Sequence, residues 1–178
     1  MKIIFAAATA AAAFCAVSGA AQAQTAAPTG VYAGIGYQNT NTSKTDADLG
    51  AIQARVGYRF MPWVGVEGEL AVGVNDDSVG PFNVKEKHSE AIYGVGFLPL
   101  SPKADLLARV GYGATKFKTT DGPVPDFSTN TDSWNFGVGG QYHFDGVNGV
   151  RVDYTRQEFT KDSFGHADVY SVAYTRRF

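Results

Sequence analysis

The chain has few of the residues that often act as nucleophiles, general bases or metal ligands. Among its 178 residues are one cysteine, three histidines and two methionines. The cysteine, Cys15, lies in an apolar N-terminal run, so the chain after that run has no disulfide, thiol nucleophile or cysteine metal site. Beyond that run, no stretch approaches 18 consecutive apolar residues, which argues against a transmembrane helix. There is no basic excess either, with 15 Lys and Arg against 17 Asp and Glu, so we expect no nucleic-acid partner.

The N-terminal run predicts a secretory signal peptide at 1–23. Lys2 supplies its basic start, 3–17 its Ala-rich apolar core, and Ala21-Gln22-Ala23 a small-x-small cleavage site. We therefore expect export through the Sec pathway and cleavage before Gln24. An uncleaved membrane anchor is the alternative, but the run is short for one. Without Lys2, the mature chain has 14 basic and 17 acidic residues, a net charge of −3.

After a short lead at 24–29, the region 30–178 forms one domain of strand-like segments, in which apolar and polar residues alternate. We predict eight strands, at 30–38, 49–60, 63–74, 87–98, 105–115, 132–144, 149–159 and 168–178. Short connections at 61–62, 99–104 and 145–148 alternate with long polar ones at 39–48, 75–86, 116–131 and 160–167. The pattern predicts an all-β, eight-stranded antiparallel transmembrane up-and-down β-barrel with short periplasmic turns and longer external loops.

The stretch WVGVEGELAVG at 63–73 has an apolar face and a charged one. Val66 and Leu70 lie on one side of the predicted strand, and Glu67 and Glu69 on the other. Similar apolar faces with aromatic ends recur in the other strands, which suits contact with lipid. Charged residues facing the core of a soluble barrel would cost several kcal/mol each if unpaired. We therefore expect the glutamates to point into a narrow polar lumen.

Arginines in neighbouring strands would neutralise these carboxylates. We predict a lumen ion network of four basic and four acidic residues: Arg55, Arg59, Glu67, Glu69, Glu90, Arg109, Arg151 and Asp153. Arg55 would face Glu67, or Glu69 if the pairing shifts by two residues. All seven arginines fall in predicted strands and all seven mature lysines in or beside connections, and Arg is the better partner for fixed bidentate pairs.

Several stretches together resemble the small eight-stranded outer-membrane barrels of the OmpA/OmpX- and opacity-protein-like group. They are GVYAGIGY, ARVGYRFMPWVGVEGEL, YGVGFLPLSPKADLLARVGYGAT, NFGVGGQYHF, GVRVDYTR and SVAYTRRF. The resemblance implies a bacterial outer-membrane location and contact with lipid and lipopolysaccharide. Because the chain stops at the predicted barrel, we expect no C-terminal peptidoglycan-binding domain. The resemblance also implies a barrel-assembly signal, read by the assembly machinery, at Tyr170, Val172, Tyr174 and Phe178. Arg176 departs from the hydrophobic residue usual at its position.

The function that these patterns favour is a non-catalytic outer-membrane barrel with a largely closed interior and a structural or surface-interaction role. The closed sheet would leave no free edge, so we expect a monomer, and the sequence names no surface ligand. A small porin or channel is the alternative. A lipid-modifying enzyme is the third possibility, with His88, Ser89, Glu90, His143, Ser163 and His166 as its candidate residues. In a strand His88 and Ser89 would point to opposite faces, which argues against a catalytic set there.

The predicted external loops carry several aspartates, at positions 46, 48, 76, 77, 121, 126 and 162. Their spacing does not match an EF-hand calcium loop. We therefore predict no metal site and no cofactor, and interpret these residues as solvated loop charges.

Overall fold

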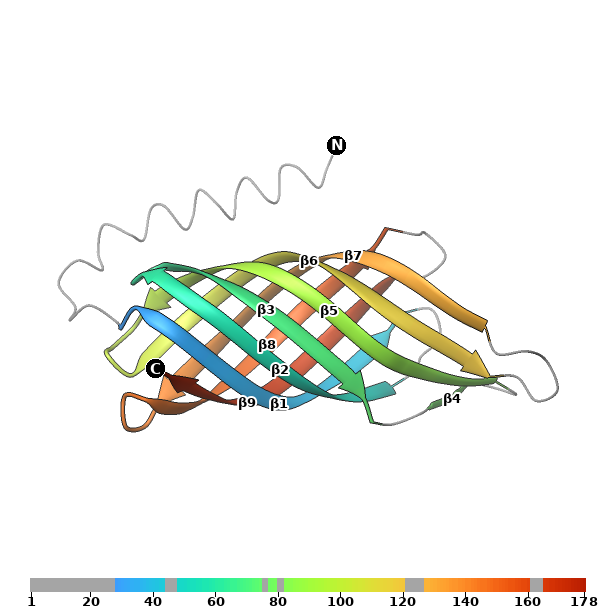
Figure 1. Cartoon of the computed structure of the whole chain (residues 1–178), viewed down its shortest axis with the longest axis horizontal. Coiled ribbons are helices and arrows are strands. Elements are labelled where there is room, and N and C mark those ends of the chain that lie inside the picture. The colour runs from blue at the N-terminus through green and yellow to red at the C-terminus, as the bar shows by residue number, and fades with distance from the viewer. Residues whose placement is uncertain (1–27, 44–47, 75–76, 80–81, 121–126, 161–164) are drawn as a thin grey trace.

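The computed structural model describes residues 28–43, 48–74, 77–79, 82–120, 127–160 and 165–178 (Figure 1). The predicted signal peptide and its cleavage site lie outside these ranges. Within the described residues, no helix is long and apolar enough to cross a membrane.

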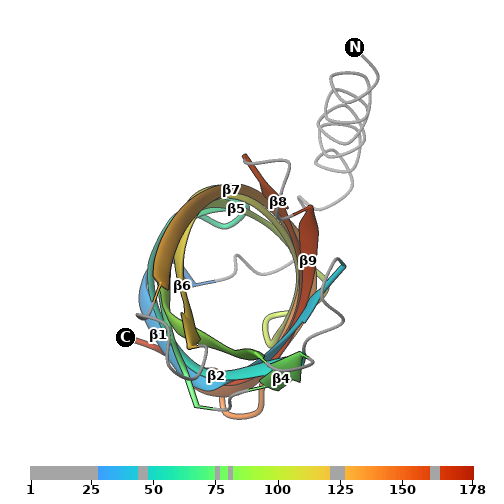
Figure 2. The ribbon, with the colours of Figure 1, turned by 90° about the vertical axis from the view of Figure 1, so that its right-hand side faces the viewer.

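The described chain folds into antiparallel strands that close into a cylinder (Figures 1 and 2). The strands are β1 (Gly30–Thr42), β2 (Asp48–Met61), β3 (Val64–Gly73), β4 (Asp77–Val79), β5 (Phe82–Pro99), β6 (Ala104–Thr120), β7 (Phe127–His143), β8 (Asn148–Phe159) and β9 (His166–Arg177). Pairing of β1 with β9 and of β3 with β5 closes the sheet, whereas β4 pairs only with β5. The predicted eight-stranded antiparallel barrel is therefore confirmed, and β4 is a short addition at one rim.

The backbone register fixes the dimensions of the cylinder. Stepping from Tyr32 across successive strand partners leads once around the barrel, through Gly57, Glu67, Tyr93, Gly111, Asn135, Gln157 and Ala167 to Thr42. The path returns to β1 ten residues further along, so the barrel has eight strands and a shear of ten. With a rise of about 3.3 Å per residue and about 4.8 Å between strands, the strands tilt by about 41°. A barrel of this size is narrow enough for side chains to fill.

The three short turns and the C-terminus lie at one end of the barrel, and β4 lies at the other (Figure 1). We call these the short-turn end and the long-connection end. At the long-connection end β5, β6 and β7 are longer than predicted, and together they take in much of 75–86 and 116–131. Lys85, Lys87, Lys116 and Lys118 thus belong to strands. The prediction missed this because paired backbone groups need no apolar side chains.

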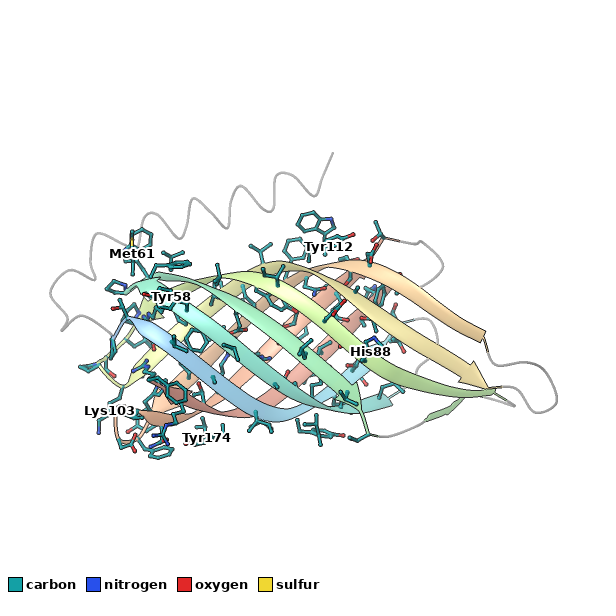
Figure 3. The ribbon with its side chains drawn as sticks, in the orientation of Figure 1. Tyr58, Met61, His88, Lys103, Tyr112 and Tyr174 are labelled. Atoms are coloured by element: carbon teal, nitrogen blue, oxygen red, sulfur yellow. The ribbon has the colours of Figure 1, made fainter. Side chains whose placement is uncertain are left out.

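The two faces of the wall are reversed relative to those of a soluble protein. Val56, Leu70 and Ile92 are 61%, 60% and 65% exposed on the outside. Glu67 and Glu69, in contrast, are only 1% and 8% exposed and face the lumen. Outward aromatic residues include Tyr58 and Tyr174 at the short-turn end and Tyr112 further along the wall (Figure 3). This arrangement suits a lipid-facing outer surface with aromatic belts.

Glycines make room inside for two large rings. A Cβ atom on Gly57 would overlap the ring of Tyr32, and one on Gly111 would overlap the ring of Tyr93. Tyr32 and Tyr93 form a buried apolar cluster with Val95, Phe97 and Leu107. The lumen therefore contains an aromatic layer as well as polar groups.

One predicted lumen residue is misplaced. Glu90 is exposed on the outer face, opposite Leu70 of β3 and Ala114 of β6. In β5 the inward residues are Tyr93 and its odd-numbered neighbours, so the even-numbered Glu90 points outward. Strand β5 has bulky apolar residues on both faces, so alternation of polarity does not define which face is inside.

Candidate functional site in the barrel lumen

Six ions from four strands form a closed cycle across the middle of the lumen. We call this cycle the ionic ring, and its members alternate in sign in the order Arg55, Glu69, Arg109, Glu67, Arg151 and Asp153. Arg55 Nε lies 2.6 Å from Glu69 Oε2, and Arg55 Nη1 lies 2.5 Å from Asp153 Oδ2. Arg109 Nη1 is 2.7 Å from Glu69 Oε2 and 3.1 Å from Glu67 Oε1. Three arginines and three carboxylates make the ring electrically neutral.

Arg151 completes the ring. Its Nη1 lies 2.6 Å from Glu67 Oε2, and its Nε lies 2.8 Å from Asp153 Oδ1. All six side chains are buried. Charge-assisted hydrogen bonds at these distances are the strongest that side chains make, and they offset part of the cost of removing the ions from water.

Neutral groups take up further donor and acceptor positions of the ring. Tyr32 donates its hydroxyl to Glu67 Oε2 at 3.1 Å, and Ser171 donates to Asp153 Oδ2 at 3.1 Å. Arg109 donates to Thr155 Oγ1 from Nη2 at 2.6 Å, and its guanidinium stacks 4.3 Å from the centre of the Tyr93 ring. These contacts hold the arginine side chains of the ring in fixed positions across the lumen.

The pairing of β2 with β3 sets which carboxylate faces Arg55. The sequence left Glu67 and Glu69 open, and the register pairs Arg55 with Glu69. An irregularity between Arg59 and Met61 shifts the register before the turn. Such a bulge is not encoded in a simple polar–apolar alternation.

A second ionic cluster lies at the short-turn end, and we call it the mouth cluster. Arg59 Nη2 lies 3.0 Å from Asp105 Oδ1, and Arg177 Nη2 lies 2.7 Å from Asp105 Oδ2. Gln141 Nε2 also donates to Asp105 Oδ2, at 2.8 Å. Arg59 further donates to the backbone oxygen of Pro62.

The structure thus divides the predicted network in two. Six of the eight predicted ions make the ring, Arg59 belongs to the mouth cluster, and Glu90 belongs to neither. Asp105 and Arg177 form an ion pair in the mouth cluster that the sequence interpretation missed. The alternation of side chains along each strand could have revealed both residues. Asp105 lies four residues before Arg109 and so on the same, inward face. Arg177 is adjacent to the outward Phe178 and so points inward.

The four residues predicted as an assembly signal, Tyr170, Val172, Tyr174 and Phe178, are exposed on the outside, at the C-terminal end of the chain. Arg176 is also exposed there, with its guanidinium 5.5 Å from the centre of the Phe178 ring.

The candidate catalytic residues do not come together in the described chain. His88 (Figure 3) is exposed on the outer face, as is Glu90. Ser89, between them, alternates to the inside. His143 is buried at the short-turn end, and His166 begins β9 at the long-connection end. Ser163 lies outside the described residues. Among the described residues, no group of three or more His, Cys, Asp or Glu could hold a metal ion.

Little free space remains beside the ionic ring. A cavity of about 10 Å³ lies on its short-turn side, lined partly by Arg59, His143 and Arg177. Another of about 10 Å³ lies on the long-connection side, lined partly by Ser133 and Asn135. Each is about the size that holds one water molecule. Chemically, the ionic ring links β2, β3, β6 and β8 to one another across the lumen.

Residues 7–178 match the family model described as outer membrane protein beta-barrel domain. No curated protein matches the chain at a significant level.

Solved structures share the fold at low identity. The attachment invasion locus protein Ail of Yersinia pestis, in complex with the heparin analogue sucrose octasulfate, has 14% identity and a TM-score of 0.65, covering 84% of this chain and 99% of that chain. Neisserial surface protein A has 12% identity and a TM-score of 0.62, covering 84% and 97%. The N-terminal barrel domain of Pseudomonas aeruginosa OprF has 12% identity and a TM-score of 0.60, covering 83% and 99%.

Proposed function

This chain belongs to the outer membrane protein β-barrel family, and from that premise we propose that it is a closed, non-catalytic barrel. In this proposal the barrel is a structural element of the bacterial outer membrane, or it presents its long-connection end to a surface partner. The observation that carries the proposal is the ionic ring, which spans the lumen between β2, β3, β6 and β8.

A solute that crosses the lumen must separate members of the ring. Removing one partner of a buried ion pair costs about 3–5 kcal/mol, because the remaining charge is left desolvated and unpaired. Each ring member has two partners of opposite sign, so opening a path means losing several contacts at once. The closed state is therefore the stable one.

The short turns of such barrels face the periplasm and the longer connections face outward. We therefore place the external surface at the long-connection end. Its segments 39–48, 74–90, 114–132 and 156–168 contain seven basic and twelve acidic residues. This negative balance favours a cationic or neutral partner. A sulfated polyanion, as bound by Ail, is disfavoured by the same balance.

A channel is the second candidate, because the external half of the lumen is polar and incompletely paired. Four buried atoms there lack a hydrogen-bond partner in the described structure: Gln38 Oε1, Thr40 Oγ1, Gln53 Nε2 and Thr131 Oγ1. Buried polar atoms of this kind are usually satisfied by water. A hydrated half-lumen is compatible with conduction only if the ionic ring opens.

The family and the sequence support a proposal for the biogenesis of the barrel. We propose that the leader at 1–23 directs Sec export and is removed, and that the assembly machinery reads the outward face of β9 from Tyr170 to Phe178. Lipid and lipopolysaccharide then surround the apolar wall. The β1–β9 pairing closes the barrel edge, which supports a monomer.

Solute efflux from liposomes tests the proposal. The mature protein is refolded into vesicles loaded with a small sugar, and insertion is checked by the gel shift between unboiled and boiled samples. We expect efflux at the rate of protein-free vesicles. Faster efflux from fully folded protein would replace the closed barrel with the channel.

A lipid analysis tests the non-catalytic part of the proposal. Cells that overproduce the protein should contain unmodified lipid A by mass spectrometry. A modification that disappears on replacing His88 or His166 would establish the enzyme instead.

A further inference from the structure

We propose that the mouth cluster binds one small monovalent anion of about the size of chloride, held by Arg177 and His143. The site lies at the periplasmic end of the lumen, separate from the ionic ring. Three independent features of the described residues support it: charge, unpaired donors and space.

The mouth cluster is positively charged, unlike the ionic ring. Arg59 and Arg177 both pair with Asp105, which leaves one positive charge without a counter-ion among the described ion pairs. The nearby Asp145 is exposed in its turn, where it accepts hydrogen bonds from the backbone and side chain of Asn148. A buried net charge is costly, so an anion in the mouth lowers the free energy of the folded state.

The unpaired buried atoms of the cluster require an acceptor. Arg177 Nη1 makes no hydrogen bond, and its side chain is only 10% exposed. Both ring nitrogens of His143 also lack partners, and this residue is 1% exposed. Arginine can only donate, and a neutral imidazole always donates from one nitrogen. A single acceptor between these two side chains would accept hydrogen bonds from Arg177 Nη1 and from one ring nitrogen of His143.

The available space selects the size of the ligand. Arg177 and His143 line the same cavity, together with Gln141 and Thr175, and its volume is about 10 Å³. This space is about the size that holds one water-sized group, so a monatomic anion fits it better than phosphate or another polyatomic anion. A water molecule could satisfy the hydrogen bonds, but it would leave the excess charge in place.

The external half of the lumen provides an internal contrast. Its unpaired atoms, on Gln38, Thr40, Gln53 and Thr131, belong to uncharged amides and hydroxyls. Water suits these groups without any charge imbalance. The argument for an anion therefore applies to the mouth cluster alone among the described unpaired groups.

Bromide diffraction tests the site directly. Crystals of the mature protein grown in sodium bromide should show an anomalous bromine peak between Arg177 Nη1 and His143. Absence of a peak there, with a water molecule in its place, would overturn the proposal. This measurement needs no substitution and does not depend on whether variants fold.

Urea unfolding in detergent micelles tests binding at low concentration. Unfolding is compared in sodium chloride and in sodium gluconate at the same ionic strength. Gluconate is the reference anion because it is too large for the cavity. At chloride tenfold above its dissociation constant, the folded-to-unfolded ratio should rise about 11-fold. An equal ratio in both salts up to 150 mM would mean that a bromide peak reflects binding at crystal concentration only, and would contradict the proposal.

Two substitutions separate the site from general salt effects. Arg177→Gln and His143→Gln should each abolish the chloride-dependent increase. Arg176→Gln, next to Arg177 but on the outer face, should keep it. If all three variants keep the full chloride effect, chloride acts elsewhere and the proposal is wrong.

Discussion

Arg55 shows what a single residue contributes to this barrel. It contacts Glu69 and Asp153 directly, and both carboxylates would lose a partner in Arg55→Ala. We expect the free energy of unfolding to fall by about 3–5 kcal/mol, measured by urea titration. Arg156→Ala is the matched control, because Arg156 pairs with Glu158 at a half-exposed site, and it should cost less than about 1 kcal/mol. Equal losses for the two variants would contradict the importance of the ring.

Glu69 and Glu90 test the assignment of inside and outside. Glu69→Gln removes a ring charge that neutralises Arg55 and Arg109, and it should destabilise the barrel by several kcal/mol. Glu90→Gln changes an exposed outer residue and should stay within about 0.5 kcal/mol of wild type. The reverse order of the two losses, in the same unfolding assay, would place Glu90 in the lumen after all.

Charged residues were the most predictable part of the site. Arg55, Glu67 and Arg109 each lie between apolar residues that face outward, so the sequence predicts that their side chains point into the lumen. Glu90 could not be placed, because β5 is apolar on both faces. The closure of the ring also escaped prediction, since its links join β8 to β2 and β3, which are far apart in sequence.

At the scale of the strand, paired glycines and aromatic rings determine the packing inside. Gly57→Val would push a branched side chain into the ring of Tyr32, and overpacking of this kind costs about 1–3 kcal/mol. Gly68→Val, on the adjacent strand, projects outward, where the nearest atom to a new Cβ is 3.9 Å away. It should be neutral within about 0.5 kcal/mol. Thermal melting followed by gel shift would rank the two, and a more harmful Gly68→Val would contradict the assigned faces.

The β7–β8 turn has its own titrating group. The side chain of Asn148 and the backbone amides of Asn148 and Val147 donate to Asp145, and they lower its pKa to about 2. Because the folded-state pKa is depressed, the stabilisation is complete above the unfolded value of about 3.9 and is lost as pH falls towards 2. An NMR titration of the Asp145 carboxyl should give a midpoint near 2. A midpoint near 4 would mean that the turn does not hold the carboxylate.

The strands could be predicted from the alternation of apolar and polar residues and from the turn residues between them. The order, number and short turns of the predicted barrel match β1 to β9, apart from β4. The long hairpin extensions of β5, β6 and β7 were missed, because Lys, Thr and Asn in 82–87 and 116–120 look like loop residues. Backbone pairing, rather than side-chain burial, extends these strands.

At the scale of the whole molecule, an apolar outer wall surrounds a core of ions and aromatic rings. Eight strands with a shear of ten give a lumen that side chains can fill, and the neutral ionic ring fills its centre. The inverted faces and the closed sheet could be predicted from the sequence. The shear could not, because it depends on bulges and register shifts between distant strands.

Single-channel recording in a planar bilayer tests the closed lumen most directly. The refolded mature protein should give no steady conductance, while Arg55→Ala, if it folds, should leak. Reproducible discrete openings of the wild-type protein, in preparations that the gel shift shows to be fully folded, would mean that the ionic ring leaves a path for ions. That result would contradict the closed barrel.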